Sequence, residues 1–329
     1  MSELHKFLFE GLPVRGMIVR LTDAWTEVQR RRAANSSTGP YAQPVQALLG
    51  EMLAAGVLMQ SNIKFNGSLI LQIFGDGPVK LAVAEIQSDL SLRATATVRG
   101  EVPAGAALGA MVNLHGAGRC AITLDPKNRL PGQQPYQGVV SLTNADYQPL
   151  AQVSDVLQHY MRQSEQLETT LVLAADDKVA AGLLIQRLPI EGMANLAGQQ
   201  PGEAELYEAE MYEHYKRIAT LAASLKREEL LTLDVETILR RLFWEEKLQR
   251  IERFTGERAP RFACSCSRER VGRMIQGLGN SEASDIVAEQ GAITVDCEFC
   301  GAQYRFDAVD VAQIFKTPGE QPPSSSSVQ

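Results

Sequence analysis

Hydrophobic positions from about residue 7 to about residue 189 alternate between strand-like and helix-like spacing. Two apolar runs, 69–74 and 79–84, flank the turn-forming sequence Gly75-Asp-Gly-Pro78, which predicts a β-hairpin. Segment 44–60 has helical spacing with apolar or small residues on every side, and such a helix is buried on more than one face. A helix layer between two sheets would bury it in this way. We therefore expect one α/β domain here.

The chain from residue 203 to residue 254 is strongly charged and keeps helical spacing, which predicts a helical connector. Val235, Ile238, Leu239 and Leu242 recur at helical intervals, and Asp234 suits the N-cap position. The plain interpretation is a helix packed on its neighbour with a solvated outer face. A sharper hypothesis is conditional stability, because a helix with a costly nucleus depends on packing. Before the connector, the polar segment 30–40 predicts a surface loop.

Length and charge narrow the class of protein. A chain of 329 residues has room for two or three folded units. The net charge of -7 argues against a nucleic-acid partner, because neutralising phosphates needs a basic surface. Glu3 and Glu10 interrupt the start where a secretory signal would be apolar, and no apolar stretch is long enough for a membrane span. We expect a cytoplasmic protein that binds no membrane. Thiols stay reduced there, so clustered cysteines indicate metal or redox chemistry.

Four of the five cysteines form two close pairs, Cys264-Ser-Cys266 and Cys297-Glu-Phe-Cys300, separated by thirty residues. Paired thiolates at such spacing can surround one tetrahedral Zn²⁺ at ~2.3 Å, because each short turn aims two sulfurs at one point. Gly301 suits the tight backbone of a zinc knuckle. Between the pairs, the sequence predicts a helix from Ser267 to Gly279, and a strand on each side of the second pair.

Two interpretations of this zinc site stay open on spacing alone. One is a permanent structural zinc ribbon, although ribbons usually offer two Cys-x-x-Cys pairs. The other is a thiol switch, since a disulfide across a one-residue gap would be strained and oxidising. Nearby cations would favour thiolate, and a unit of about sixty residues would depend on zinc worth ~10–16 kcal/mol. The nearby cations are Arg261, Arg268, Arg270 and Arg305.

Other chemistries fit the sequence poorly, and we expect no enzyme. A thioredoxin-like pair should open a helix, but an alternating run follows Cys300. A catalytic zinc keeps one position open, and four cysteines leave none. No Gly-x-x-x-x-Gly-Lys-Ser/Thr loop for ATP is present. Cys120 lies in a strand-like run and is expected to be a buried, inert thiol. The histidines show no paired metal spacing and are assigned to surface or core: His5, His115, His159 and His214.

The sequence resembles the heat shock protein 33 (33 kDa chaperonin) family of redox-regulated bacterial chaperones. The resemblance is carried by Cys264-Ser-Cys266-Ser-Arg-Glu-Arg270, by Cys297-Glu-Phe-Cys300-Gly301 and by segment 304–310. It extends over nearly the whole chain, through Gly75-Asp-Gly-Pro78, Tyr136-Gln-Gly138 and segment 230–244. Together these motifs are highly specific.

The resemblance implies a mixed α/β and α+β fold in several parts. Residues 1–190 would form a β/α/β layered N-terminal domain for substrate binding and dimerisation. Residues 191–258 would form a metastable helical linker, and residues 259–316 a zinc-binding redox-switch domain. Residues 317–329 would be a disordered tail, in keeping with their Pro and Ser content.

The resemblance also implies how such a protein works. Reduced and zinc-bound, it would be inactive. Oxidation would form the disulfides Cys264–Cys266 and Cys297–Cys300, zinc would leave and the linker would unfold. The oxidised homodimer would act as an ATP-independent holdase for unfolded or misfolded clients under oxidative stress, and could pass them to ATP-dependent refolding chaperones. We expect the client-binding surface to include residues that linker unfolding exposes: Leu239, Leu242, Phe243 and Trp244. The alternative is a constitutive zinc-ribbon interaction module without redox control.

Overall fold

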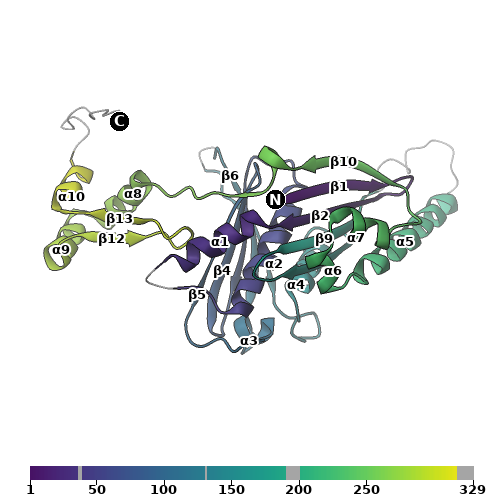
Figure 1. The fold of residues 1–329 in the computed structure, drawn as a ribbon, viewed down its shortest axis with the longest axis horizontal. Helices are drawn as coiled ribbons and strands as arrows, with labels where there is room; N and C mark the ends of the chain where they lie inside the picture. The colour runs from purple at the N-terminus through teal and green to yellow at the C-terminus, as the bar shows by residue number, and fades with distance from the viewer. Residues whose placement is uncertain (36–38, 130–131, 190–200, 317–329) are drawn as a thin grey trace. The chain divides into compact units, whose positions relative to one another are not determined.

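The computed structural model describes residues 1–35, 39–129, 132–189 and 201–316 (Figure 1). The chain divides into two compact units, Met1–Ala263 and Cys264–Gln329. The predicted tail and the first ten residues of the predicted linker lie outside the described residues. The predicted boundaries at 190/191 and 258/259 stay predictions.

Two sheets form the first unit (Figure 1). In both, neighbouring strands are antiparallel, except for the parallel pair β11 and β5. The predicted hairpin is confirmed as β3 and β4, with Leu69 opposite Ile86. The six-stranded sheet has the order β11 (Arg261–Phe262), β5 (Ser91–Val98), β4 (Val79–Gln87), β3 (Gly67–Phe74), β6 (Arg119–Pro126), β7 (Tyr136–Ser141). The five-stranded sheet has the order β10 (Leu248–Phe254), β1 (Glu3–Phe9), β2 (Val14–Leu21), β9 (Ala180–Arg187), β8 (Thr169–Ala175).

Helix α2 (Gln43–Gln60) lies between the two sheets and contacts strands of both, as its sequence predicts. Two glycines permit this close packing. A Cβ on Gly50 would lie 2.5 Å from Cβ of Ala175 in β8, and a Cβ on Gly56 would lie 2.2 Å from Cδ1 of Ile86 in β4. The helix therefore packs against each sheet through a position that has no side chain. This arrangement is the β/α/β layering that the resemblance implies.

Three further helices complete this part of the first unit: α1 (Asp23–Ala33), α3 (Leu108–Val112) and α4 (Val153–Ser164). The prediction of a loop over 30–40 is wrong at its start, because α1 continues to Ala33. Arg30 and Arg31 both pair with Glu27, one turn earlier, and such pairs support a helix that polar composition alone does not reveal. Trp25 of α1 is buried and donates to the Asp176 carbonyl at 2.7 Å.

The outer face of the five-stranded sheet is covered by α5 (Pro201–Ala223), α6 (Arg227–Thr232) and α7 (Val235–Leu242). Apolar side chains of the helices and of β1, β2 and β9 form one core cluster. Phe243, just after α7, packs edge-on against Phe9 of β1 with 5.1 Å between ring centroids. Arg20 of β2 adds a polar tie, because its guanidinium donates to the carbonyls of Leu230, Leu231 and Leu233 at the end of α6.

The connector is helical as predicted through Leu242, but the prediction of helix up to residue 254 is wrong. Residues Leu248–Phe254 form β10, which pairs antiparallel with β1. Without β10, β1 would be the edge of the sheet with unpaired backbone N–H and C=O groups. Backbone pairing along that edge therefore outweighs the helical spacing of the charged side chains.

The second unit contains α8 (Arg268–Leu278), α9 (Asn280–Gln290), β12 (Ile293–Asp296), β13 (Gln303–Phe306) and α10 (Ala308–Ile314). The Ser267 hydroxyl caps α8, and Gly279 follows its last residue, both as predicted. The core is small: Ile275, Ala283, Ile293, Phe306 and Val311. Within the described residues of the whole chain, we find no helix with the length and apolar character needed to cross a bilayer.

Glu51 of α2 lines a cavity of about 680 Å³, with Oε1 4.0 Å from Nη1 of Arg227 in α6. Burial raises the pKa of Glu51 to about 7, and Arg227 offsets this only in part. Because the folded-state pKa lies above that of an unfolded glutamate, the ionised carboxylate opposes folding. Stability is therefore lost as pH rises from about 4.5 to about 7.

We predict that Glu51→Gln raises the free energy of unfolding at pH 8 by about 1–3 kcal/mol and has little effect at pH 5. Urea denaturation at both pH values measures the difference. Glu101→Gln, at an exposed position, is the control and should stay within about 0.5 kcal/mol of the wild type. A loss of stability in Glu51→Gln at pH 8 would show that the Arg227 pair outweighs the cost of burial.

Candidate metal centre

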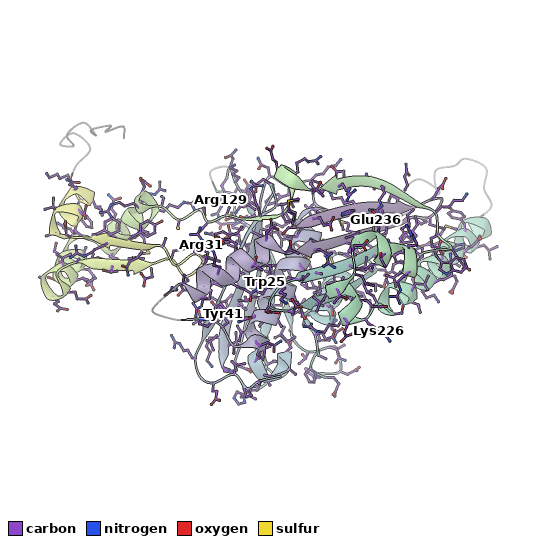
Figure 2. The ribbon with its side chains drawn as sticks, viewed as in Figure 1. Trp25, Arg31, Tyr41, Arg129, Lys226 and Glu236 are labelled. Atoms are coloured by element: carbon purple, nitrogen blue, oxygen red, sulfur yellow. The ribbon has the colours of Figure 1, made fainter. Side chains whose placement is uncertain are left out.

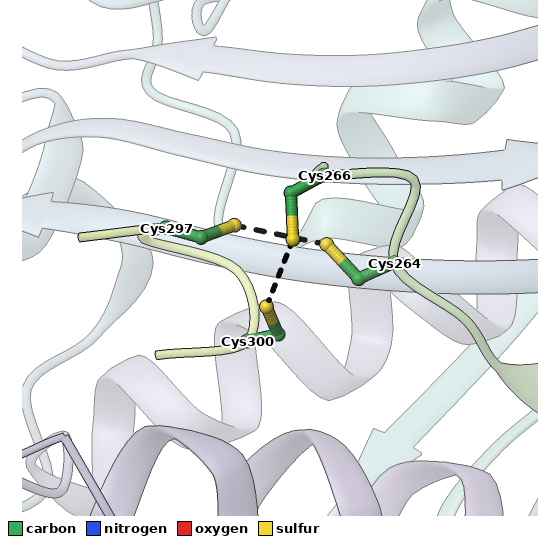
Figure 3. A group of neighbouring side chains, drawn as sticks. All are labelled: Cys264, Cys266, Cys297 and Cys300. Carbon is green, nitrogen blue, oxygen red and sulfur yellow. Dashed lines mark hydrogen bonds between the residues drawn. The ribbon is translucent and has the colours of Figure 1, made fainter. Parts of the chain in front are cut away.

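Two irregular segments of the second unit carry the four clustered cysteines (Figure 3). Cys264 and Cys266 precede α8, while Cys297 and Cys300 lie in the turn between β12 and β13. The turn is closed by two backbone hydrogen bonds, from Gly301 N–H to the Cys297 carbonyl at 2.7 Å and from Cys297 N–H to the Ala302 carbonyl at 2.8 Å. Gly301 has φ of 70°, the left-handed conformation that glycine adopts freely, as the knuckle interpretation predicts.

The four sulfurs all lie within 4.8 Å of one another. Sγ of Cys264 is 3.7 Å from Sγ of Cys297, and Sγ of Cys266 is 3.3 Å from Sγ of Cys300. An ion that binds four thiolates tetrahedrally at ~2.3 Å requires sulfurs ~3.8 Å apart, so the donor set fits such an ion. The predicted gathering of the four cysteines is confirmed. These two close contacts each join one cysteine of the first pair to one of the second (Figure 3).

Crowding makes these thiols hard to ionise without a cation. The neighbouring Cys264 thiol and then burial hold the pKa of Cys297 well above its usual range. Burial raises the pKa of Cys300 to about 11. The backbone amides of Phe299 and Cys300 lower the pKa of Cys297, but too little to compensate. Because four thiolates at these distances repel one another, the site needs positive charge, which a divalent metal ion supplies.

The predicted role of the nearby arginines stays a prediction, and three of the four have partners other than the cysteines. Arg268 pairs with Asp310 at 2.7 Å, Arg270 donates to Ser265 Oγ at 2.7 Å, and Arg261, in the first unit, pairs with Asp89. The backbone amides of the knuckle turn are instead the groups that favour thiolate at Cys297. Backbone amides have no charged side chain, so the sequence pattern does not reveal their effect.

Tyr304 of β13 is a neighbour that the sequence reasoning treated only as a strand residue. Its hydroxyl donates to Sγ of Cys266 at 3.1 Å, and this hydrogen bond raises the pKa of Tyr304 to about 12. Tyr304 lies opposite Val295 in the pairing of β13 with β12, so the strand fixes its position beside the sulfur. A hydrogen-bond donor to a thiolate supports its charge.

The residues predicted to bind clients differ in their exposure to solvent. Leu239, Leu242 and Phe243 are buried in the cluster beneath α5–α7, whereas Trp244 is 75% exposed. The expectation that unfolding is needed to expose Trp244 is therefore wrong, since the chain turns outward directly after Phe243. Cys120 is buried in β6 as predicted, and burial raises its pKa to about 12, which accords with an inert thiol.

Comparisons with known proteins point to one family over nearly the full length of the chain. The family model described as Hsp33 protein matches residues 2–307. The 33 kDa chaperonin of Chromobacterium violaceum is 44% identical over 95% of this chain and 94% of its own length. That of Methylobacillus flagellatus is 40% identical, with 96% and 95% covered. The crystal structure of the 33 kDa chaperonin from Thermotoga maritima shares the fold, with a TM-score of 0.68 at 19% identity, over 95% of this chain and 97% of that one.

We predict that Cys300→Ser lowers affinity for a divalent metal at least tenfold, because a serine hydroxyl is a poor substitute for a thiolate. Competition against a chromophoric chelator measures the affinity. Cys120→Ala, a change at the cysteine far from the cluster in sequence, should bind metal as the wild type does. Equal affinity in Cys300→Ser and the wild type would remove Cys300 from the ligand set.

Proposed function

Because this chain belongs to the Hsp33 protein family, we propose that it is a chaperone that holds unfolding proteins without ATP, under control of its four clustered thiols. The observation that carries the proposal is the convergence of Cys264, Cys266, Cys297 and Cys300 within 4.8 Å. Zn²⁺ is the resident ion we infer, since four thiolates in tetrahedral array suit it, and it would supply the charge that keeps them ionised.

Oxidation is the proposed trigger. Two thiolates lose two electrons to one peroxide, a disulfide forms, and the peroxide takes up two protons to become two waters. Two such steps would give Cys264–Cys266 and Cys297–Cys300. This pairing follows from the family resemblance alone, because the two close sulfur contacts join the first pair of cysteines to the second. Disulfide sulfurs are poor metal ligands, so the four residues would no longer hold zinc.

Loss of the ion would leave the second unit without sufficient support. Its buried cluster has five members among the described residues, and metal ligation in small zinc units is worth ~10–16 kcal/mol. Residues 255–263 are all that separate β10 from Cys264 along the chain. Within them, β11 pairs with β5 over two residues only. We infer that unfolding of the second unit passes along this short segment to β10 and the connector.

Release of the connector would uncover the outer face of the five-stranded sheet. Phe7, Phe9 and Ile18 of the sheet would then be exposed together with Leu239, Leu242 and Phe243. Such a continuous apolar surface can bind the exposed hydrophobic segments of unfolded proteins. Trp244 is already accessible and would extend this surface. We further propose that the oxidised form is a homodimer in the cytoplasm and can pass clients to ATP-dependent refolding chaperones.

The alternative is a constitutive zinc-ribbon interaction module. Oxidation would then leave partner binding unchanged. The hydrogen bond of Tyr304 to Cys266 and the turn around Gly301 suit a permanent site equally well, so the distinction depends on the response to oxidant.

We predict that peroxide treatment at elevated temperature releases one zinc per chain and, in the same sample, suppresses aggregation of a thermally unfolding client. A chromophoric zinc indicator and light scattering follow the two events. The Cys120→Ala variant should behave as the wild type. Zinc release without suppression would contradict the chaperone, while suppression of equal size before and after oxidation would favour the constitutive module.

We also predict that Arg20→Lys speeds activation by peroxide about fivefold. Lysine cannot reproduce the fork that reaches three carbonyls at the end of α6, and a loss of about 1 kcal/mol in docking free energy corresponds to that factor. The time to half-maximal suppression of aggregation measures it. Arg129→Lys, which alters an exposed pair with Asp125, is the matched control and should activate at the wild-type rate. An unchanged rate in Arg20→Lys would show that this tie does not limit release.

A further inference from the structure

His5 is the one fully buried histidine of the four, all of which lie in the described residues. It sits on β1, opposite Ile18 of β2 and Arg253 of β10. Sequence spacing suggested no role for it beyond surface or core. Its position opposite β10, the strand of the connector, suggests a functional role.

Both ring nitrogens of His5 are engaged. Nδ1 lies 2.7 Å from Nη1 of Arg250 in β10, and Nε2 lies 2.7 Å from Oε2 of Glu3. A guanidinium can only donate, so Nδ1 must be an unprotonated acceptor. The proton of the neutral ring is therefore on Nε2, where it is donated to Glu3. This tautomer follows from the partners alone.

Arg250 extends the contact to a second element of the connector. Its Nη2 donates to Oε2 of Glu236 in α7 at 2.6 Å, and Glu236 is labelled in Figure 2. One guanidinium thus ties a buried ring of β1 to both β10 and α7.

The charged groups around His5 are few. Glu3 is on its own strand, and Arg250 and Arg253 are on β10, with Arg253 3.9 Å from Glu3. Glu236 of α7 acts through Arg250. On β2, Arg20 lies opposite Glu3 in register but is bonded to the carbonyls of α6. Among the residues that the structure describes, Glu3 is the carboxylate in direct contact with the ring.

We propose that His5 is a proton-sensitive latch: protonation of Nδ1 removes the acceptor of Arg250 and sets a second positive charge beside it, which loosens β10 and α7 from the sheet. This latch is separate from thiol control, because it acts in the reduced protein and needs no client. Acid would then loosen the docked connector, in addition to oxidation.

The direction of the pH effect follows from linkage. Burial lowers the pKa of His5 below its usual 6.5, Glu3 opposes this through its hydrogen bond and charge, and Arg253 and Arg250 add to the lowering. The docked state therefore binds fewer protons than the released state. The docking contribution is complete above about pH 6.5 and is lost as pH falls through the lowered pKa. One proton gives at most about a tenfold change in the opening equilibrium between pH 7.5 and 5.5.

Glu51 responds to pH in the opposite sense, because its raised pKa makes protonation favour the folded state near Arg227 of α6. A pH profile of the wild type alone would combine the two groups. The decisive comparison is between the wild type and a variant in which only residue 5 cannot titrate.

The test is hydrogen exchange across residues 248–254 in the reduced, zinc-loaded protein at pH 7.5 and 5.5, corrected for the intrinsic pH dependence of exchange. We expect the opening equilibrium to rise by up to about tenfold in the wild type and less than twofold in His5→Asn, whose Oδ1 can accept from Arg250. His115→Asn, at an exposed position, should keep the wild-type response. An equal pH response in His5→Asn and the wild type would overturn the proposal.

Should His5→Asn fail to fold, the wild type itself decides. Histidine ring signals in NMR give the titration midpoint of His5 in the reduced protein and in the same protein unfolded in urea. We expect a lower midpoint in the folded protein. Equal midpoints in the two states would overturn the latch, and neither result depends on whether the protein is a chaperone.

Discussion

The central constraint on this fold is that the five-stranded sheet has two apolar faces, and each needs a cover. Helix α2 covers one face as part of a sandwich with the six-stranded sheet, and its two glycines allow both sheets to approach closely. The other face, with Phe7, Phe9 and Ile18, is covered by α5–α7 of the connector. The first cover lies inside a two-sheet core, whereas the second is a set of helices on the outside. The connector therefore covers the sheet from outside the two-sheet core.

Polar contacts set how firmly this outer cover is held. Arg20 binds the end of α6, Arg250 joins α7 to His5, and β10 pairs with the edge strand β1. These contacts come from the first unit alone. The metal centre belongs to the second unit, whose buried core among the described residues is small. We propose that folding of the metal-binding unit and docking of the connector are coupled through residues 255–263, so that a change in four sulfurs alters the apolar surface under the connector.

Much of this could be predicted from the sequence because the signals are local. The hairpin at Gly75-Asp-Gly-Pro78, the buried helix α2, the cap at Ser267 and the convergence of the four cysteines all follow from spacing and turn chemistry. The sequence predictions were wrong or incomplete for residues whose structural partners are distant along the chain. Strand β10 exists because β1 offers an open edge, and the paired residues are 239 to 250 positions apart in the chain. Trp244 is exposed because the chain turns after Phe243, and the position of Tyr304 beside Cys266 depends on the register of β12 with β13. None of these is encoded in a local pattern.

We propose that the state of the four thiols decides whether α6 and α7 stay on the sheet. Hydrogen exchange of residues 227–242, compared in one preparation before and after oxidation and zinc removal, tests this most directly. We expect strong protection in the reduced protein and loss of most of it after oxidation, while α2 and β3 remain protected. Equal protection of residues 227–242 in the two states would contradict it.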